Sequence, residues 1–159
     1  MLQIQPLSQT TLQEACKLQH KYLYPKDEYE KQTLHASLDK EHFLEVYKKS
    51  YIRTMNYWVG VVDGKVIGLI GIYEEPSDNS TTCWLGWFVV AKEFRHLGYG
   101  KQLLEFAINV TKEQNKHTLK LYCYNSHEFG KALTLYEKFG FSVYKTRKKE
   151  IFLQKDLKA

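Results

Sequence analysis

A short segment of the chain combines two glycines with flanking basic side chains, a composition suited to binding phosphate. Residues 95–101 read Arg-His-Leu-Gly-Tyr-Gly-Lys and lie between an apolar run and a stretch with helical periodicity. A helix that begins after such a turn leaves several backbone N–H groups without intrahelical partners. These groups and the helix dipole favour an anion, and Gly98 and Gly100 carry no Cβ that would hold a phosphate off the backbone. We call residues 95–101 the phosphate turn.

Two common nucleotide motifs do not fit this turn. A P-loop requires G-x-x-x-x-G-K-[ST], but the two glycines are too close together and no Ser or Thr follows Lys101. A dinucleotide fingerprint requires a third glycine where Leu103 stands. The remaining pattern is R-x-x-G-x-G, from Arg95 to Gly100, which by itself also suits an ordinary strand-to-helix turn.

A second pattern lies about 40 residues further along the chain, where a helix is expected to end and a strand to begin. Leu135 to Phe141 read L-Y-E-K-F-G-F, and Ala132 stands four residues before Tyr136. Gly140 predicts a left-handed stop of the helix. A tyrosine packed beside such a glycine is common in α/β proteins, so this pattern gains meaning only together with the first.

The two patterns, in this order and with a strand between them, resemble the GNAT superfamily of acetyl-CoA-dependent N-acetyltransferases. The resemblance runs from Asn56 to Leu153, whereas the first 55 residues match only in the order of their helices. It implies acetyl-CoA as co-substrate, with its phosphates on the turn and its thioester along main-chain groups of the preceding strand, which in the family bends away from its neighbour. The implied cofactor-binding residues are Phe88, Val89, Val90, Arg95, His96, Leu97, Gly98, Tyr99, Gly100 and Lys101.

The sequence departs from the family pattern at two positions. Many members carry an asparagine where this chain has Phe129, so we take Asn125, at the end of the preceding strand, as the candidate replacement. Members also often carry a glutamate in the strand before the turn, but residues 83–87 contain no carboxylate. Glu74 and Glu75 are the nearest candidates for a general base, and we assign Glu75, although both also suit a solvated loop.

Acetyl transfer to an amine needs both a base and an acid. An alkyl amine of pKa about 10.4 is neutral in only about one molecule in 2,500 at pH 7, which costs roughly 4.6 kcal/mol. The leaving thiolate has a conjugate acid of pKa about 8.5, and a phenol of pKa about 10 stays protonated and can donate to it. Tyr136 matches the position that the family uses for this general acid.

The acceptor amine is the least determined part of the prediction. The resemblance places it against the first two helices and the last hairpin. Asp27, Glu28 and Glu30 would attract a cationic amine there, unless they only form a charged helix surface. Four aromatic residues would line an apolar wall, or else belong to the core: Tyr24, Tyr29, Trp58 and Trp84.

Composition limits the class of protein. The chain has 159 residues, of which 43% are hydrophobic and 26% charged, so we expect one soluble domain over residues 1–159. No apolar run approaches the roughly 20 residues that span a membrane, and no secretory signal is visible. Three widely spaced cysteines indicate free thiols in the cytoplasm, and no His or Cys spacing suggests a metal. The net charge of +5 suits an anionic ligand such as CoA, whereas scattered lysines disfavour nucleic acid.

The pattern of elements predicts an α/β fold with a mixed sheet in the order β-α-α-β-β-β-α-β-α-β-β. A capping box, Thr11 with Glu14, should begin the first helix, Pro25 should end it, and Ser126 should cap the last helix. Asp63-Gly64 predicts a tight hairpin turn. The expected ranges are strands 2–6, 56–62, 65–73, 82–90, 119–124, 141–146 and 150–153, helices 12–23, 99–114 and 126–138, a helical region 27–53 broken near 37–40, and a loop 74–81.

Three functions are compatible with these features. The first is an N-acetyltransferase that acetylates a small or peptide primary amine by direct attack, with Tyr136 as general acid. The sequence does not fix its oligomeric state, and a homodimer is one of the states compatible with it. The second is a catalytically silent GNAT-like module that senses CoA, which the missing strand carboxylate favours. The third, a basic nucleic-acid-binding domain, would need a clustered basic face with stacking aromatics.

Overall fold

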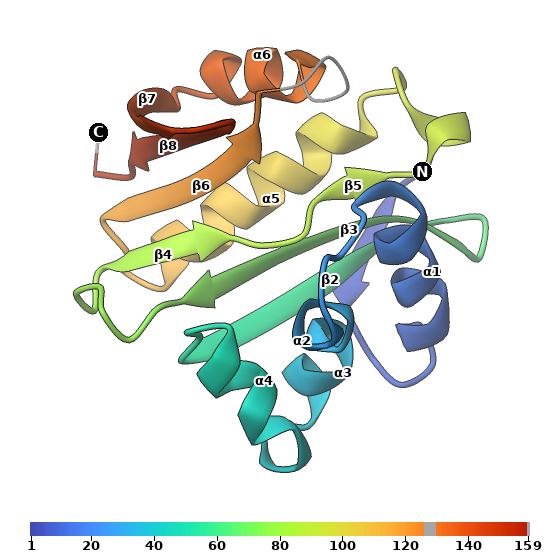
Figure 1. The fold of residues 1–159 in the computed structure, drawn as a ribbon. Helices are drawn as coiled ribbons and strands as arrows, with labels where there is room; N and C mark the ends of the chain where they lie inside the picture. Colours follow the sequence, from blue (N-terminus) through green and yellow to red (C-terminus); the bar gives the residue numbers. More distant parts are fainter. Residues whose placement is uncertain (126–129, 159) are drawn as a thin grey trace.

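The computed structural model describes residues 1–125 and 130–158, and within them eight strands form one twisted sheet (Figure 1). The sheet order is β1-β2-β3-β4-β6-β8-β7, with β5 paired to β3 beyond the end of β4. The mixed α/β fold predicted from the sequence is therefore confirmed. The strands are β1 (Gln3–Pro6), β2 (Thr54–Val62), β3 (Lys65–Glu74), β4 (Thr82–Leu85), β5 (Val89–Val90), β6 (Thr118–Tyr124), β7 (Ser142–Arg147) and β8 (Glu150–Asp156).

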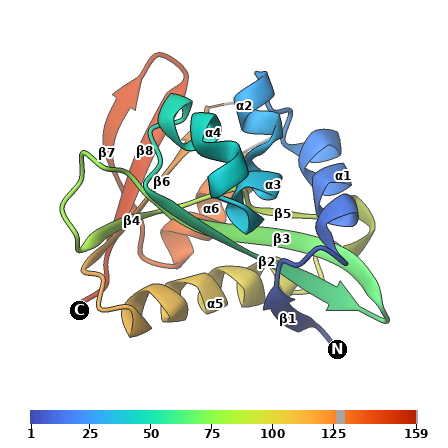
Figure 2. The same cartoon turned by 90° about the horizontal axis from the view of Figure 1, so that it is seen from below.

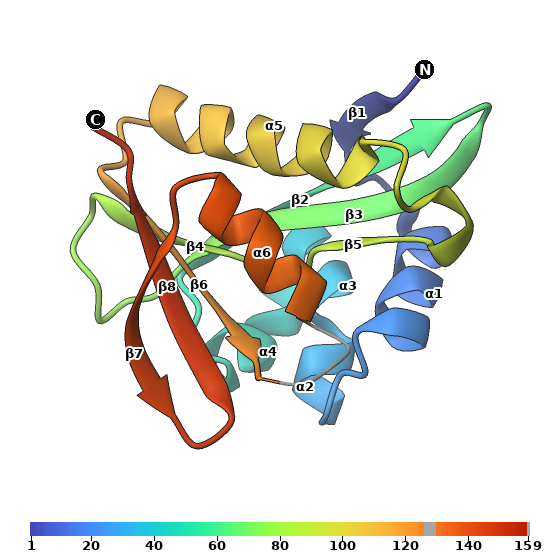
Figure 3. The same ribbon diagram turned by 90° about the horizontal axis from the view of Figure 1, so that it is seen from above.

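Helices cover both faces of the sheet (Figures 2 and 3). The first four α-helices lie on one face, and α5 and α6 lie on the other. The predicted break near residues 37–40 is present, and the same region is interrupted again at Gln32. The helices are α1 (Leu12–Tyr22), α2 (Glu28–Lys31), α3 (Thr33–Leu38), α4 (Leu44–Lys49), α5 (Tyr99–Glu113) and α6 (Gly130–Lys138), with 3-10 turns η1 (Glu41–Phe43) and η2 (Lys92–Phe94).

Local signals account for the connections that were predicted correctly. Asp63 and Gly64 both adopt positive φ values, 49° and 78°, as the tight turn between β2 and β3 requires. The only connection that joins two parallel neighbours in the described sheet is β4-α5-β6, with Thr82 opposite Thr118. Helix α5 covers this crossover because Leu103, Leu104, Ala107 and Ile108 are spaced on one face and are buried.

The predicted strand 82–90 is wrong, because it is broken into β4 and β5. Gly86 still donates its N–H to the Gly71 carbonyl at 2.7 Å, and pairing resumes where Val89 lies opposite Leu69. Between these two points β3 contributes one residue, Ile70, whereas the other strand contributes Trp87 and Phe88. One extra residue on one strand is a β-bulge, which bends the strand and leaves backbone groups unpaired. We call residues 86–88 the bulge.

Three further expectations need comment. The capping box is absent, since Thr11 bonds to Ser8 and Glu14 instead accepts the Val66 N–H at 3.3 Å. Glu74 belongs to β3 and not to a loop. Gly140 has the predicted left-handed conformation, with φ of 91°. The predicted cap at Ser126 lies outside the described residues, as does Phe129.

Candidate active site

The phosphate turn presents a row of open backbone amides at the start of α5. Gly98 is the N-cap and has φ of 87°, a conformation that L-residues rarely adopt. Within the described chain, no residue accepts a hydrogen bond from the backbone N–H of residues 96–101. These amides and the α5 dipole therefore provide the unpartnered donors that an anion requires.

The basic and apolar side chains of the turn lie at its surface. His96 is exposed and has φ of 65°, Leu97 is 60% exposed, and Lys101 is also exposed. Tyr99 instead packs partly against the α5 core. A Cβ at Gly100 would lie 3.8 Å from Val90 Cγ2 and 3.9 Å from Phe88 Cζ, both ordinary contacts. The protein itself therefore has room for a side chain at position 100.

Tyr22 of α1 fixes the other end of the turn, a role that the sequence did not indicate. Its hydroxyl accepts the Lys92 N–H at 3.2 Å, and the Arg95 guanidinium lies 5.0 Å above its ring. Arg95 also donates its Nε–H to the Val90 carbonyl at 2.8 Å. Arg95 thus holds the turn against β5, and only the remaining guanidinium N–H groups are available to a ligand.

The bulge connects the phosphate turn to the two faces of the sheet. Trp87 packs against the core under α1–α4, whereas Phe88 packs against the core under α5 and α6. No described residue pairs with the backbone N–H of Phe88 in a regular hydrogen bond. Val89 differs, because it lies in a hydrogen-bonded pair with Leu69, in step with the Ala91 N–H that bonds to the Ile67 carbonyl two residues further along. Val90 lies in the alternate, non-hydrogen-bonded position opposite Gly68, so its N–H points away from β3. Of the positions with an open amide, Phe88 is the one whose ring lies beside Tyr136.

Tyr136 lies next to Phe88 at the end of α6. Phe141 donates its N–H to the Tyr136 carbonyl and Gly140 donates to the Glu137 carbonyl, both at 3.1 Å, which is the Schellman pattern. The Tyr136 ring lies 5.8 Å from Phe141 and 6.3 Å from Phe88. Its side chain is 7% exposed, and burial raises the pKa of its hydroxyl. Because its pKa is raised, the hydroxyl is protonated at neutral pH. No described side chain bonds to it, so it is able to donate to a ligand.

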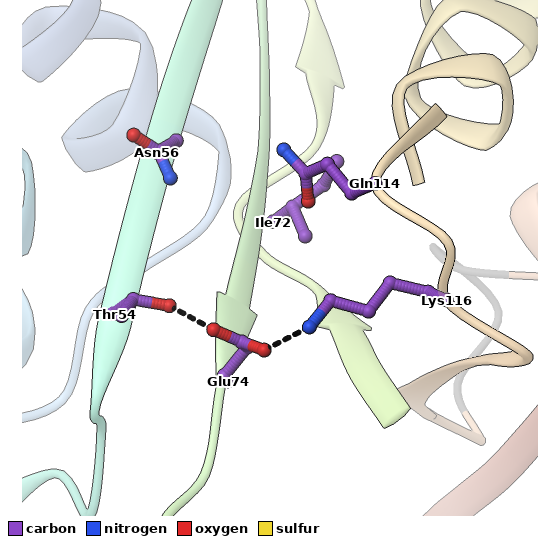
Figure 4. Close-up of a pocket in the computed structure, with 6 residues that line it drawn as sticks. All are labelled: Thr54, Asn56, Ile72, Glu74, Gln114 and Lys116. Atoms are coloured by element: carbon purple, nitrogen blue, oxygen red, sulfur yellow. Dashed lines mark hydrogen bonds and ion pairs between the residues drawn. The ribbon is translucent and has the colours of Figure 1, made fainter. Parts of the chain in front are cut away.

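Glu74 is committed to an ion-pair cluster and is not available as a base (Figure 4). Lys116 Nζ bonds to its carboxylate, Arg53 approaches to 3.3 Å, and Thr54 donates its hydroxyl at 2.6 Å. Burial would raise the pKa of Glu74, but the bonds from Lys116 and Thr54 and the nearby cations together lower it. Of the two adjacent glutamates, only Glu75 therefore has a pKa that is shifted upward, as a general base requires.

Glu75 is half-buried just beyond the end of β3. Burial, and then the negative charge of Asp78, raise the pKa of Glu75, while Lys120 opposes this shift. Glu75 stands four residues beyond Gly71, which is about 13 Å along an extended strand from the start of the bulge. A proton that travels from the bulge to Glu75 would therefore have to pass through water.

A contiguous aromatic layer covers the sheet beside the bulge, and we call it the aromatic face. Neighbouring ring centroids are 5.8–6.5 Å apart, and Tyr122 and Tyr144 remain 42% and 39% exposed. The sequence analysis found only one of its members, Trp84, although aromatic residues at alternate positions of β6 gave a usable signal. The members are Tyr73, Trp84, Tyr122, Tyr144 and Phe152.

The other expected acceptor residues do not gather at this face. Trp58 packs against Phe106 of α5, on the opposite side of the sheet, so it does not line the expected wall. Three acidic residues have local partners: Asp27 caps α2, Glu28 pairs with Lys31, and Glu30 accepts the Lys26 N–H. The exposed Tyr24 follows the end of α1, and the exposed Tyr29 lies within α2. Asn125 is exposed and donates its N–H to the Lys149 carbonyl at 2.6 Å.

Comparison with known proteins identifies the class. The model of the acetyltransferase (GNAT) family matches residues 15–141, so the chain belongs to this family and is an acyltransferase. The probable N-acetyltransferase camello of Xenopus tropicalis is 30% identical over 97 residues, which are 59% of this chain and 42% of that protein. The match thus spans less than half the length of this curated relative.

Two solved structures share the fold at lower sequence identity. A GNAT-family acetyltransferase from Desulfovibrio desulfuricans superposes with a TM-score of 0.78 at 14% identity, covering 99% of both chains. The PaiA N-acetyltransferase of Thermoplasma acidophilum, solved in complex with coenzyme A, gives a TM-score of 0.70 at 19% identity, covering 98% of this chain and 99% of its own.

Among the described residues, no helix is both long and apolar enough to cross a membrane. No group of three or more His, Cys, Asp or Glu side chains within residues 1–125 and 130–158 is arranged to hold a metal ion. All three cysteines are free thiols.

Proposed function

We propose that this protein transfers an acetyl group from acetyl-CoA to a primary amine by direct attack. The observation that carries the proposal is the alignment of the open amides of residues 96–101 with the bulge and with Tyr136. The phosphates of CoA would bind the turn, and the thioester would reach the open Phe88 N–H. The coenzyme A in the related Thermoplasma structure supports this choice of co-substrate.

The reaction follows from the groups available at the bulge. The amine nitrogen attacks the thioester carbonyl carbon, a C–N bond forms, and charge develops on the carbonyl oxygen. The Phe88 N–H would stabilise that charge. The C–S bond then breaks, and Tyr136 donates its phenolic proton to the departing sulfur. The amine loses one proton to water and, through it, to Glu75, and solvent later returns a proton to Tyr136.

The aromatic face would receive the acceptor. Tyr73, which stacks on Trp84, packs against the core under α1–α4, whereas Tyr136 belongs to the core under α5 and α6, so an amine placed at the aromatic face would approach the bulge from the side opposite Tyr136. Five ring surfaces favour an acceptor that carries an apolar group besides its amine. Carboxylates and cations both surround this face, so we do not assign the acceptor from charge.

The decisive experiment combines binding with turnover. Calorimetry with acetyl-CoA should show binding to the full-length protein, and thiol release with a panel of apolar and purely aliphatic polar primary amines should show turnover. Binding without release for any amine would favour the silent CoA-sensing module, which the missing strand carboxylate supports. Failure to bind acetyl-CoA would refute both functions.

A further inference from the structure

Tyr57 of β2 occupies space that two glycines on neighbouring strands leave free. It lies opposite Gly71 of β3, and its ring covers that residue so closely that a Cβ there would lie 2.2 Å from Cδ1 and Cε1. The ring then reaches across to the bulge, where a Cβ at Gly86 would lie 2.7 Å from the hydroxyl oxygen. Neither position could carry a larger residue while the ring stays in place. The Tyr57 side chain therefore extends from β2 across β3 to the start of the bulge, and the two glycines leave room for it.

The tip of this side chain meets the point where β4 leaves β3. Gly86 makes the last bond to Gly71, and the Tyr57 hydroxyl lies against Gly86, where the Trp87 backbone N–H offsets part of the rise that burial causes in the pKa of that hydroxyl. The Trp87 indole N–H is also bound, to Thr33 Oγ1 at 2.7 Å. Both polar hydrogens of Trp87 thus lie near hydroxyl groups on the helix side. The chain cannot return to β3 at this residue, and Phe88 turns to the opposite face, beside Tyr136.

We propose that Tyr57 is a positioning residue for acyl transfer, which holds the bulge open so that the Phe88 N–H is presented to the thioester carbonyl. This inference rests on the proposed acetyltransferase function. No sequence pattern indicated this role for the Tyr57 hydroxyl, because the path of the side chain depends on glycines at positions 71 and 86, on two other strands. Tyr57 does not need to touch either substrate to act in this way.

The test compares Tyr57→Phe with the wild type and with Tyr47→Phe as matched control. Tyr47 also faces the core under α1–α4, and its hydroxyl donates to the Ala36 carbonyl at 2.9 Å, far along the chain from the bulge. Each variant therefore loses one buried phenol hydroxyl. Loss of an oxyanion donor lowers turnover by about a hundredfold or more, so a weakened donor should lower kcat of Tyr57→Phe by about tenfold. KM for acetyl-CoA should stay within about twofold, because the phosphate turn is untouched.

The ratio of the affinities for acetyl-CoA and CoA distinguishes this positioning role from a purely structural one, which would leave the ratio unchanged. If Phe88 binds the thioester carbonyl, the wild type should bind acetyl-CoA more tightly than CoA by about fivefold, the effect of one hydrogen bond. Tyr57→Phe should lose this preference, while Tyr47→Phe should keep both the preference and kcat. Equal kcat and an unchanged ratio in Tyr57→Phe would overturn the inference. Absence of acetyl-CoA binding or transfer in the wild type would instead refute the proposed function itself.

Discussion

A single methyl group at position 100 should strengthen the fold and weaken the binding of acetyl-CoA. Gly100 lies in the first turn of α5 and has no positive φ. An added Cβ meets Val90 and Phe88 at 3.8 and 3.9 Å, within the ordinary range for carbon contacts of about 3.5–4.0 Å. In a helix interior, alanine is about 1 kcal/mol more favourable than glycine, and this difference is smaller at the start of a helix. We expect Gly100→Ala to raise the free energy of unfolding by about 0.5 kcal/mol.

The same methyl group should obstruct the ligand. Cα–Cβ bonds in a helix tilt toward its N-terminus, so this one points toward the phosphate turn. Hydrogen bonds to charged groups contribute about 1.5–3 kcal/mol each. If the phosphates lose one such bond, the dissociation constant for acetyl-CoA should rise by about tenfold to a hundredfold, since 1.4 kcal/mol is a factor of ten.

Urea unfolding and calorimetry measure the two effects on the same variant. Glu105→Ala, an exposed substitution on the same helix, is the matched control and should leave the affinity for acetyl-CoA unchanged. Gly98→Ala is less informative, because the φ of 87° makes any side chain there cost about 1–2 kcal/mol. Wild-type affinity in Gly100→Ala would refute the assignment of the phosphate turn.

Three other predictions follow from the same geometry. Tyr136→Phe should lower kcat at least tenfold with little change in acetyl-CoA affinity, because only the sulfur loses its proton donor; steady-state kinetics would remove Tyr136 from this role if kcat were unchanged. Since burial raises the pKa of Glu75, wild-type kcat should fall as the pH drops through that raised pKa, and Glu75→Gln should lack this acidic limb. Lys116→Met should lower the free energy of unfolding at pH 7 by about 1–3 kcal/mol by leaving Glu74 unpaired. Because the folded-state pKa of Glu74 is lowered, the stability that its ion pairs provide is present above its unfolded pKa, so urea titrations should show this difference shrinking as the pH falls through the folded-state pKa.

Short-range signals made much of the fold predictable. The Asp63-Gly64 turn, the stop at Gly140 and the apolar face of α5 each depend on residues that are close in the sequence. The two motifs fixed the order of strand, turn and helix around the phosphate turn. Identification of Tyr136 as the side chain beside the bulge followed from its place in the second motif, and its catalytic role stays a prediction.

Features built from distant residues escaped prediction. Glu74 was predicted to lie in a loop, because its partner Lys116 is 42 positions away in the sequence. The resemblance implied that the strand before the phosphate turn bends away from its neighbour, but its apolar residues suit a continuous strand equally well, so one strand was predicted over residues 82–90. Only the pairing of Gly71 with Gly86 shows where that strand breaks. The aromatic face was missed for a similar reason, since it gathers one ring from each of five strands.

Residues on both faces of the sheet contact the bulge. On the helix side, Thr33 Oγ1 accepts hydrogen bonds from the Trp87 indole and from Gln19 Nε2, so α1 and α3 are tied to it. On the other side, Phe88 lies beside Tyr136 and next to the start of α5. The polar hydrogens of Trp87 lie near hydroxyl groups on the helix side, whereas the open amide of Phe88 belongs to a residue that packs on the α5 side. In the proposed reaction, an amine on the aromatic face would approach a thioester at Phe88 from the other side of the broken strand, at the break between β4 and β5.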